Sequence, residues 1–236
     1  MTHAPLTSPR RATTIALAFA LSAVSAITAA QDTALPAGWH AIPLTADKKP
    51  TAYSFEHEGA RNVIHAHAEA AAMALAHTAP DDATQRPILR WRWKVSHALE
   101  SADNRVGAKE DAAARVVLSF DGDKGALGLF DQAALAISSH LSGREMAYAT
   151  LMYIWSAHDP VGTVIDNPHT GRVKMIVAAS GPGGAWQTVR RNWVEDFRHC
   201  FGEAPGRMLA YGVLTDTDNT GESVDAWYSD IGFTEH

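Results

Sequence analysis

Alternation of apolar and polar residues is the strongest pattern along the chain. In 89–95 (LRWRWKV), apolar residues take every second place and basic residues take the places between. A strand shows its side chains alternately on two faces, so this pattern predicts a strand with one buried face and one solvated face. The runs 115–120 (RVVLSF) and 150–155 (TLMYIW) are also typical of strands.

Further strands are predicted along the chain, most of them bounded by turn residues. They cover 51–55, 62–68, 173–178, 186–189 and two runs within 211–233. The segment 35–39 reads as an extended entry. The Ala-rich run that ends at His77 stays open between strand and helix, because alanine favours helices.

Helical spacing of apolar residues occurs in only two segments, 127–141 and 193–201. Nine or ten short strands with regular turns favour a mainly β fold over a doubly wound α/β sheet. We therefore expect an antiparallel β-sandwich, a jelly roll, with one or two short helices.

The N-terminus has the features of a secretory signal peptide. Arg10 and Arg11 precede an apolar stretch, and small residues at 28–30 suit cleavage before Gln31. We expect a signal peptide at 1–30, a single domain at 31–236, and a periplasmic or secreted protein. The apolar stretch is too short for a lasting membrane span, so no stable membrane insertion is expected after cleavage.

Composition narrows the range of partners. The single cysteine, Cys200, allows no intramolecular disulfide. Loss of 1–30, with two arginines and no acid, takes the formal charge from −6 to −8. An acidic protein is poorly suited to binding nucleic acid through its overall charge, so no nucleic-acid partner is expected. Neutral sugars, cations and basic partners remain open, and the sequence does not determine the oligomeric state.

Several blocks of the sequence resemble a known family. They are LRWRWKV (89–95), EDAAARVVLSF (110–120), TLMYIWS (150–156), WQTVRRNWVEDFRHCFGE (186–203) and GVLTDTDNTGESVDAWYSDIGF (212–233). In this order they resemble the bacterial exported family called domain of unknown function 3047, which has no assigned activity. The strand pattern is also similar to galactose-binding-like and carbohydrate-binding jelly rolls. That similarity implies a carbohydrate ligand by analogy of fold.

An acidic turn near the C-terminus is a candidate metal site. Asp216, Asp218 and Asn219 place three oxygen-bearing side chains within four residues, and Asp230 follows on the next strand. Calcium prefers such oxygen ligands, so a structural calcium is one hypothesis. An EF-hand is excluded because its twelfth place, which needs a glutamate, is Trp227. The alternative is a solvated turn whose side chains cap backbone N–H groups.

Asp230 has a second interpretation. Acids are rare in strands, so an inward-facing Asp230 would need a cationic partner, with Arg115 or Arg190 as the natural candidates. Glu56 could join either arrangement, because the first and last strands of jelly rolls often lie side by side.

Aromatic and basic residues on the strands are candidates for binding a glycan, since flat rings stack on sugar faces. The candidate ligand-binding residues are Arg115, Tyr153, Trp155, Arg190, Trp227 and Tyr228. For most of the aromatic residues the competing interpretation is a place in the core. Trp227 and Tyr228 are consecutive and must point in opposite directions, which leaves one of them exposed.

No complete catalytic motif is present in the sequence. His65, His67 and Glu69 share one strand face but need a further ligand to bind zinc or copper, and a solvated polar face is the commoner outcome. The sequence therefore favours an exported, non-catalytic binding module for a carbohydrate or cell-envelope glycan. The alternatives are a periplasmic polysaccharide lyase or glycoside hydrolase, and a structural or protein-interaction domain.

Overall fold

The computed structural model describes residues 35–143 and 145–236. The predicted signal peptide at 1–30 lies outside these residues, so its cleavage and the export of the protein stay predictions. Within the described residues, no helix is long and apolar enough to cross a membrane.

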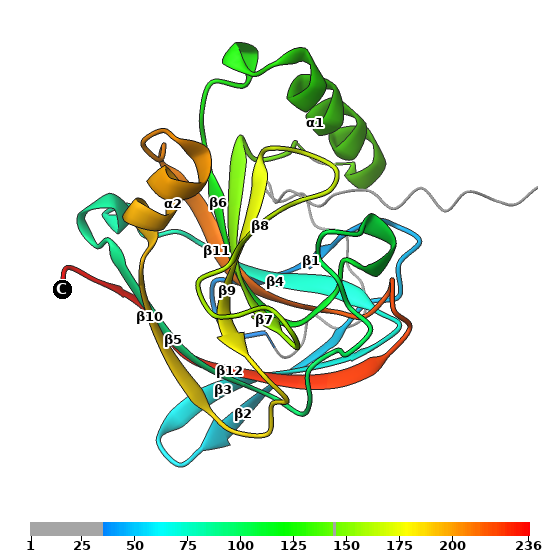
Figure 1. The fold of residues 1–236 in the computed structure, drawn as a ribbon. Helices are drawn as coiled ribbons and strands as arrows, with labels where there is room; N and C mark the ends of the chain where they lie inside the picture. Colours follow the sequence, from blue (N-terminus) through cyan, green and yellow to red (C-terminus); the bar gives the residue numbers. More distant parts are fainter. Residues whose placement is uncertain (1–34, 144) are drawn as a thin grey trace, which may run out of the picture.

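Two sheets form a β-sandwich of the jelly-roll class, as the sequence predicts (Figure 1). The seven-stranded sheet has the order β1 (Trp39–Pro43), β4 (Ala72–Thr78), β11 (Met208–Asp216), β6 (Ala112–Phe120), β7 (Ala149–Ser156), β9 (Val173–Ser180) and β8 (Val164–Asp166). The five-stranded sheet has the order β10 (Gln187–Asn192), β5 (Ile88–Val95), β12 (Ser223–Thr234), β3 (Arg61–Glu69) and β2 (Ala52–Glu58). Every strand pair is antiparallel except β7 with β9.

The main core lies between the two sheets. Trp91 and Trp93 of β5 are fully buried there, in edge-to-face contact with ring centroids 5.3 Å apart. Tyr153 of β7 packs on Trp91 from the other sheet, with centroids 5.1 Å apart. The alternation in 89–95 thus puts its apolar face into the core and turns its basic face outward.

A second apolar cluster covers the outer face of the seven-stranded sheet. It includes Met152, Met175 and Leu214, and the helix α1 (Leu129–Ser142) contributes Leu135 to it. The opposite side of α1 leaves Leu129 and Phe130 largely exposed. The other helix, α2 (Trp193–Phe201), packs Phe197 onto the sandwich.

Most of the predicted elements are confirmed, and α2 has the predicted bounds. The Ala-rich run that ends at His77 is strand β4 and not a helix, because β1 and β11 pair with it on both sides. Pairing with neighbouring strands decides against the helical propensity of alanine. The residue pattern did not predict β1, which pairs with β4, or the short strand β8.

Candidate functional site

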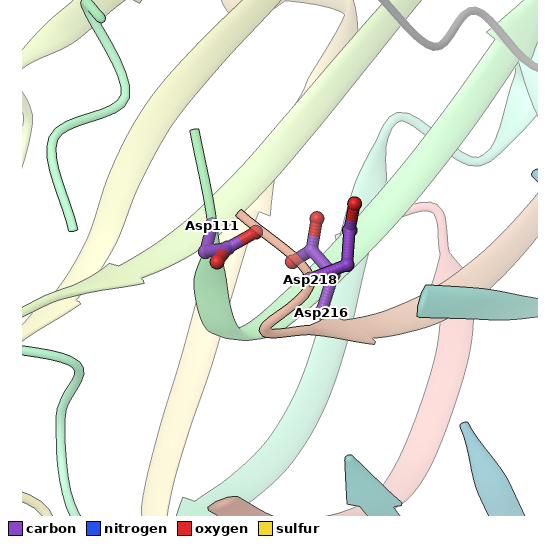
Figure 2. Close-up of side chains that lie close together, drawn as sticks. All are labelled: Asp111, Asp216 and Asp218. Atoms are coloured by element: carbon purple, nitrogen blue, oxygen red, sulfur yellow. The ribbon is translucent and has the colours of Figure 1, made fainter. Parts of the chain in front are cut away.

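The acidic turn joins β11 to β12 and lies beside the segment that enters β6. Carboxylate oxygens of Asp111, Asp216 and Asp218 lie within 4.8 Å of one another (Figure 2). Among the described residues these three form the only group of acids, histidines and cysteines with this spacing. Asp111 was not among the predicted ligands, because it lies about a hundred residues from the turn and only the pairing of β11 with β6 places it there.

Arg115 of β6 is the main partner of Asp216. Its Nε lies 3.1 Å from Oδ1 and its Nη2 lies 3.0 Å from Oδ2, a bidentate pair with only 1% of Arg115 exposed. Glu110 accepts from Nη1 at 3.2 Å. Burial raises the pKa of Asp216 to about 7, Arg115 opposes that rise, and the nearby charge of Asp111 adds to it.

The other acids of the cluster also have partners within the protein. Asp111 accepts from the backbone N–H of Asn219 at 3.1 Å, and from that of Thr220 at 2.6 Å. Lys48 lies 2.6 Å from Oδ2 of Asp218. Asp218 Oδ1 is buried and has no hydrogen-bond partner among the described residues. The predicted turn residues therefore meet in one cluster, with Arg115 and Lys48 as counter-charges. Calcium binding at this cluster stays a hypothesis.

Asp230 does not join this cluster, which corrects the hypothesis that it acts with Asp216 as a ligand. It lies on β12 in the other sheet, at an irregularity of strand pairing, with φ +55° and a half-exposed side chain. Its Oδ2 lies 3.5 Å from Arg61 Nε and 3.8 Å from Arg92 Nη1. The predicted pairing with Arg115 or Arg190 is also wrong, because Asp230 faces outward and Arg115 belongs to Asp216.

Four predicted ligand-binding residues are buried: Arg115, Tyr153, Trp155 and Tyr228. The Tyr153 hydroxyl donates to Asp196 at 2.7 Å, and the polar atoms of the other three residues also bond within the protein. A ligand arriving from solvent cannot reach these side chains without opening the core. For these four residues the competing interpretation, a structural place inside the fold, is correct.

The remaining two predicted ligand-binding residues, Trp227 and Arg190, lie on the outer face of the five-stranded sheet. Trp227 stands between His65 of β3 and Lys94 of β5, because register places these residues opposite it on the two neighbouring strands. The His65 and Trp227 rings are parallel within 6°, with centroids 5.0 Å apart. Lys94 Nζ lies 4.1 Å from the centre of the Trp227 ring.

The row continues to the edge of the sheet. Lys94 Nζ lies 5.4 Å from the centre of the Trp186 ring, and the guanidinium of Arg92 lies 5.0 Å from it. Trp186 immediately precedes β10, the edge strand. We call Trp186, Lys94, Trp227 and His65 the aromatic row. The Trp227 ring lies between His65 and Lys94, so its neighbours in the row cover it. The Trp186 ring contacts Arg92 and Lys94 of β5 and lies at the open edge of the sheet.

Two carboxylates hold His65 in place beside the row. Asp225 Oδ1 lies 2.8 Å from Nε2 of His65, and Glu56 Oε1 lies 3.1 Å from Nδ1. His67 Nδ1 lies 3.0 Å from the same Asp225 oxygen. Burial alone would raise the pKa of Asp225, but hydrogen bonds with His65 and His67 outweigh burial and lower it. Glu56 thus contacts His65 on the neighbouring β3, and not the acidic turn, because β2 pairs with β3 and not with β12.

Sequence reasoning missed Trp186, Lys94, His65 and Asp225 as one surface. The alternation in 89–95 does place Lys94 on the solvated face, and His65 also lies on a polar strand face. What the sequence lacks is the order of the strands and their register, which bring β3, β12, β5 and β10 side by side.

Cys200 is half-buried against the core, where burial raises the pKa of its thiol to about 11 and leaves it a poor nucleophile at neutral pH.

Comparison with known families identifies the family of this chain. The chain belongs to the family described as protein of unknown function DUF3047, whose model matches residues 37–232. No curated protein matches the sequence.

Solved structures with a similar strand arrangement share little sequence with this chain. Endoglucanase 3 of Trichoderma harzianum, from family GH12, has 8% identity and a TM-score of 0.43, covering 84% of this chain and 93% of its own. The xyloglucanase domain of NopAA, a type three effector from Sinorhizobium fredii solved with cellobiose, has 8% identity and a TM-score of 0.44, covering 85% and 95%. At this identity the likeness concerns the fold alone.

Proposed function

We propose that this protein is a glycan-binding module whose ligand lies on the outer face of the five-stranded sheet. The observation that carries the proposal is the aromatic row, which places two indoles and an imidazole on a solvated sheet face. Core packing does not explain this arrangement, since the buried tryptophans of the same sheet point the other way.

The chemistry of the row suits a sugar. The C–H groups of a pyranose face pack on an indole ring, and hydroxyl groups need donors and acceptors close to that ring. Trp186 offers a ring at the sheet edge. Asp225, Glu56 and Ser54 offer acceptors and a hydroxyl near His65. Sheet surfaces hold such groups at fixed spacing, so little conformational entropy is lost when a ligand binds.

A second candidate function is hydrolysis or lytic cleavage of a polysaccharide at the same face. It is favoured by one observation, the contact of two carboxylates, Glu56 and Asp225, with opposite nitrogens of His65. Glycoside hydrolysis needs two carboxyl groups on either side of the scissile bond. We rank this second, because in this arrangement both carboxylates are engaged with the same imidazole.

We also propose that the protein acts in the periplasm or outside the cell, on the basis of the signal-like segment at 1–30. Mass spectrometry of the protein recovered from the periplasmic fraction tests this. An N-terminus near Gln31 is expected, and recovery of uncleaved chain in the cytoplasm alone would contradict it.

A glycan array with purified residues 31–236 tests the binding function. Trp186→Ala is expected to weaken binding about tenfold, because a stacked ring contributes on the order of 1 kcal/mol or more. Phe130→Ala, which removes an exposed aromatic ring from α1, serves as the control and should bind like the wild type. Product analysis of the bound glycans then separates binding from cleavage. Binding that survives the loss of both Trp186 and Trp227 would remove this face as the site.

A further inference from the structure

The charge on the outer face of the five-stranded sheet indicates which glycans bind. Four cations line the half of this face built by β5 and β10, and we call them the basic strip: Arg90, Arg92, Lys94 and Arg190. The protein as a whole has a formal charge of −6. The strip is therefore a local reversal of sign on an acidic molecule.

The strip is poorly neutralised by the protein itself. Arg190 has no ion pair or hydrogen bond from its side chain among the described residues, and Arg90 donates only to the main-chain oxygen of His236. Lys94 contacts rings and no carboxylate. The nearest acid, Asp230, lies 3.8 Å from Arg92 and is shared with Arg61.

The placement of the two exposed arginines is unfavourable for the fold alone. Register sets Arg190 directly opposite Arg90 on neighbouring antiparallel strands. Like charges at such positions destabilise a sheet. A bound anion would relieve this repulsion, and the planar guanidinium groups match the two oxygens of a carboxylate.

We infer that the ligand is a carboxylate-bearing polysaccharide, a polyuronate, that lies along β5 with its acid groups on the basic strip and a sugar ring against Trp186. This inference rests on the proposed glycan-binding function. Residues on one strand face recur every ~7 Å, so Arg90, Arg92 and Lys94 present a regular line of positive charge to a linear polyanion. The row and the strip share Lys94, which places ring stacking and charge recognition side by side.

Binding of residues 31–236 to three probes tests the inference: uronate oligosaccharides, neutral oligosaccharides of equal length, and single-stranded DNA. Uronate binding is expected to exceed neutral binding at least tenfold and to weaken as salt rises, since salt screens exposed charges. The variant Arg90→Gln/Arg190→Gln should lose most of this preference. The control Arg198→Gln/Arg207→Gln removes the same charge from two exposed residues, one in α2 and one just before β11, and should keep the preference.

Each alternative outcome has a distinct meaning. Equal or better binding of neutral oligosaccharides would overturn the polyuronate inference and leave the glycan-binding function standing. Binding of no oligosaccharide by folded protein would overturn both. Tighter binding of single-stranded DNA than of uronates would overturn the inference, because the strip would then be a general surface for anions. Equal loss of uronate binding in the control variant would also overturn it, because the basic strip would then not be the binding site.

Discussion

The ion pair between Arg115 and Asp216 allows the sharpest test of how the fold is stabilised. In the variant Asp216→Ala, the guanidinium loses contacts of 3.1 and 3.0 Å, and the backbone N–H of Ala112 loses its acceptor at 3.0 Å. Arg115 is 1% exposed, so water cannot replace the carboxylate. Breaking a buried pair from one side costs about 3–5 kcal/mol, and Glu110, which stays at 3.2 Å, keeps the cost from exceeding that range.

Urea unfolding followed by tryptophan fluorescence at pH 8 measures this cost. The control is Asp230→Asn, which removes a half-exposed charge 3.5 and 3.8 Å from its two arginines, keeps a side chain that tolerates φ +55°, and should cost less than about 1 kcal/mol. The double variant Arg115→Met/Asp216→Leu should be more stable than Asp216→Ala, because it leaves no charge beside Met152 and Met175. If Asp216→Ala and the Asp230 control cost the same, the burial argument for this pair is refuted.

The same pair predicts a dependence of stability on pH. The pKa of Asp216 is about 7 in the folded protein and 3.8 as the ordinary value. A raised folded-state pKa means that the folded state holds the proton more tightly. The extra stability that comes from protonation of Asp216 is therefore full below about pH 4 and lost as pH rises through 7. The contacts of the ionised carboxylate with Arg115 and with the N–H of Ala112 remain at pH 8. Asp216→Asn should flatten the unfolding free energy across this window, and an unchanged slope would contradict the assignment.

Three further predictions concern other parts of the molecule. Trp91→Ala should lower the free energy of unfolding by about 3–5 kcal/mol in urea titrations, because the ring is fully buried. Asp225→Asn should make the free energy of unfolding fall less on acidification. The pKa of Asp225 is lowered in the folded protein, so its contribution to stability is present above pH 4 and lost as pH falls. The same dependence of unfolding free energy on acid pH in variant and wild type would contradict this. Calcium or a chelator should leave the melting midpoint unchanged, because Arg115 and Lys48 already face the acidic cluster, and a midpoint raised by calcium would instead establish a cation site.

Much of the fold follows from local pattern. Alternation in 89–95 predicts β5 and its buried face, and the sequence of α2 predicts a helix whose first turn carries Glu195 and Asp196. These features need only neighbouring residues, because side-chain period and helix capping act over a few positions. The Ala-rich β4 was harder to predict, since its state depends on pairing with distant strands.

The candidate site was less predictable. All four aromatic residues Tyr153, Trp155, Trp227 and Tyr228 are candidates for ligand binding by residue type. In the structure, Trp227 lies on the outer face and the other three are buried. Asp230 shows the same limit. Its strand was predicted, but its outward direction follows from an irregular pairing with β5 that no local pattern reports.

By itself, the sequence determined the class of fold, the solvated and buried faces of single strands, and the presence of an acidic turn. These depend on period and composition, which are local. Only the tertiary structure decided that Asp216 pairs with Arg115, and that Trp186, Lys94, Trp227 and His65 form one row. Strand order and register decide which distant residues come into contact. Both result from the packing of the whole sandwich and not from any local segment.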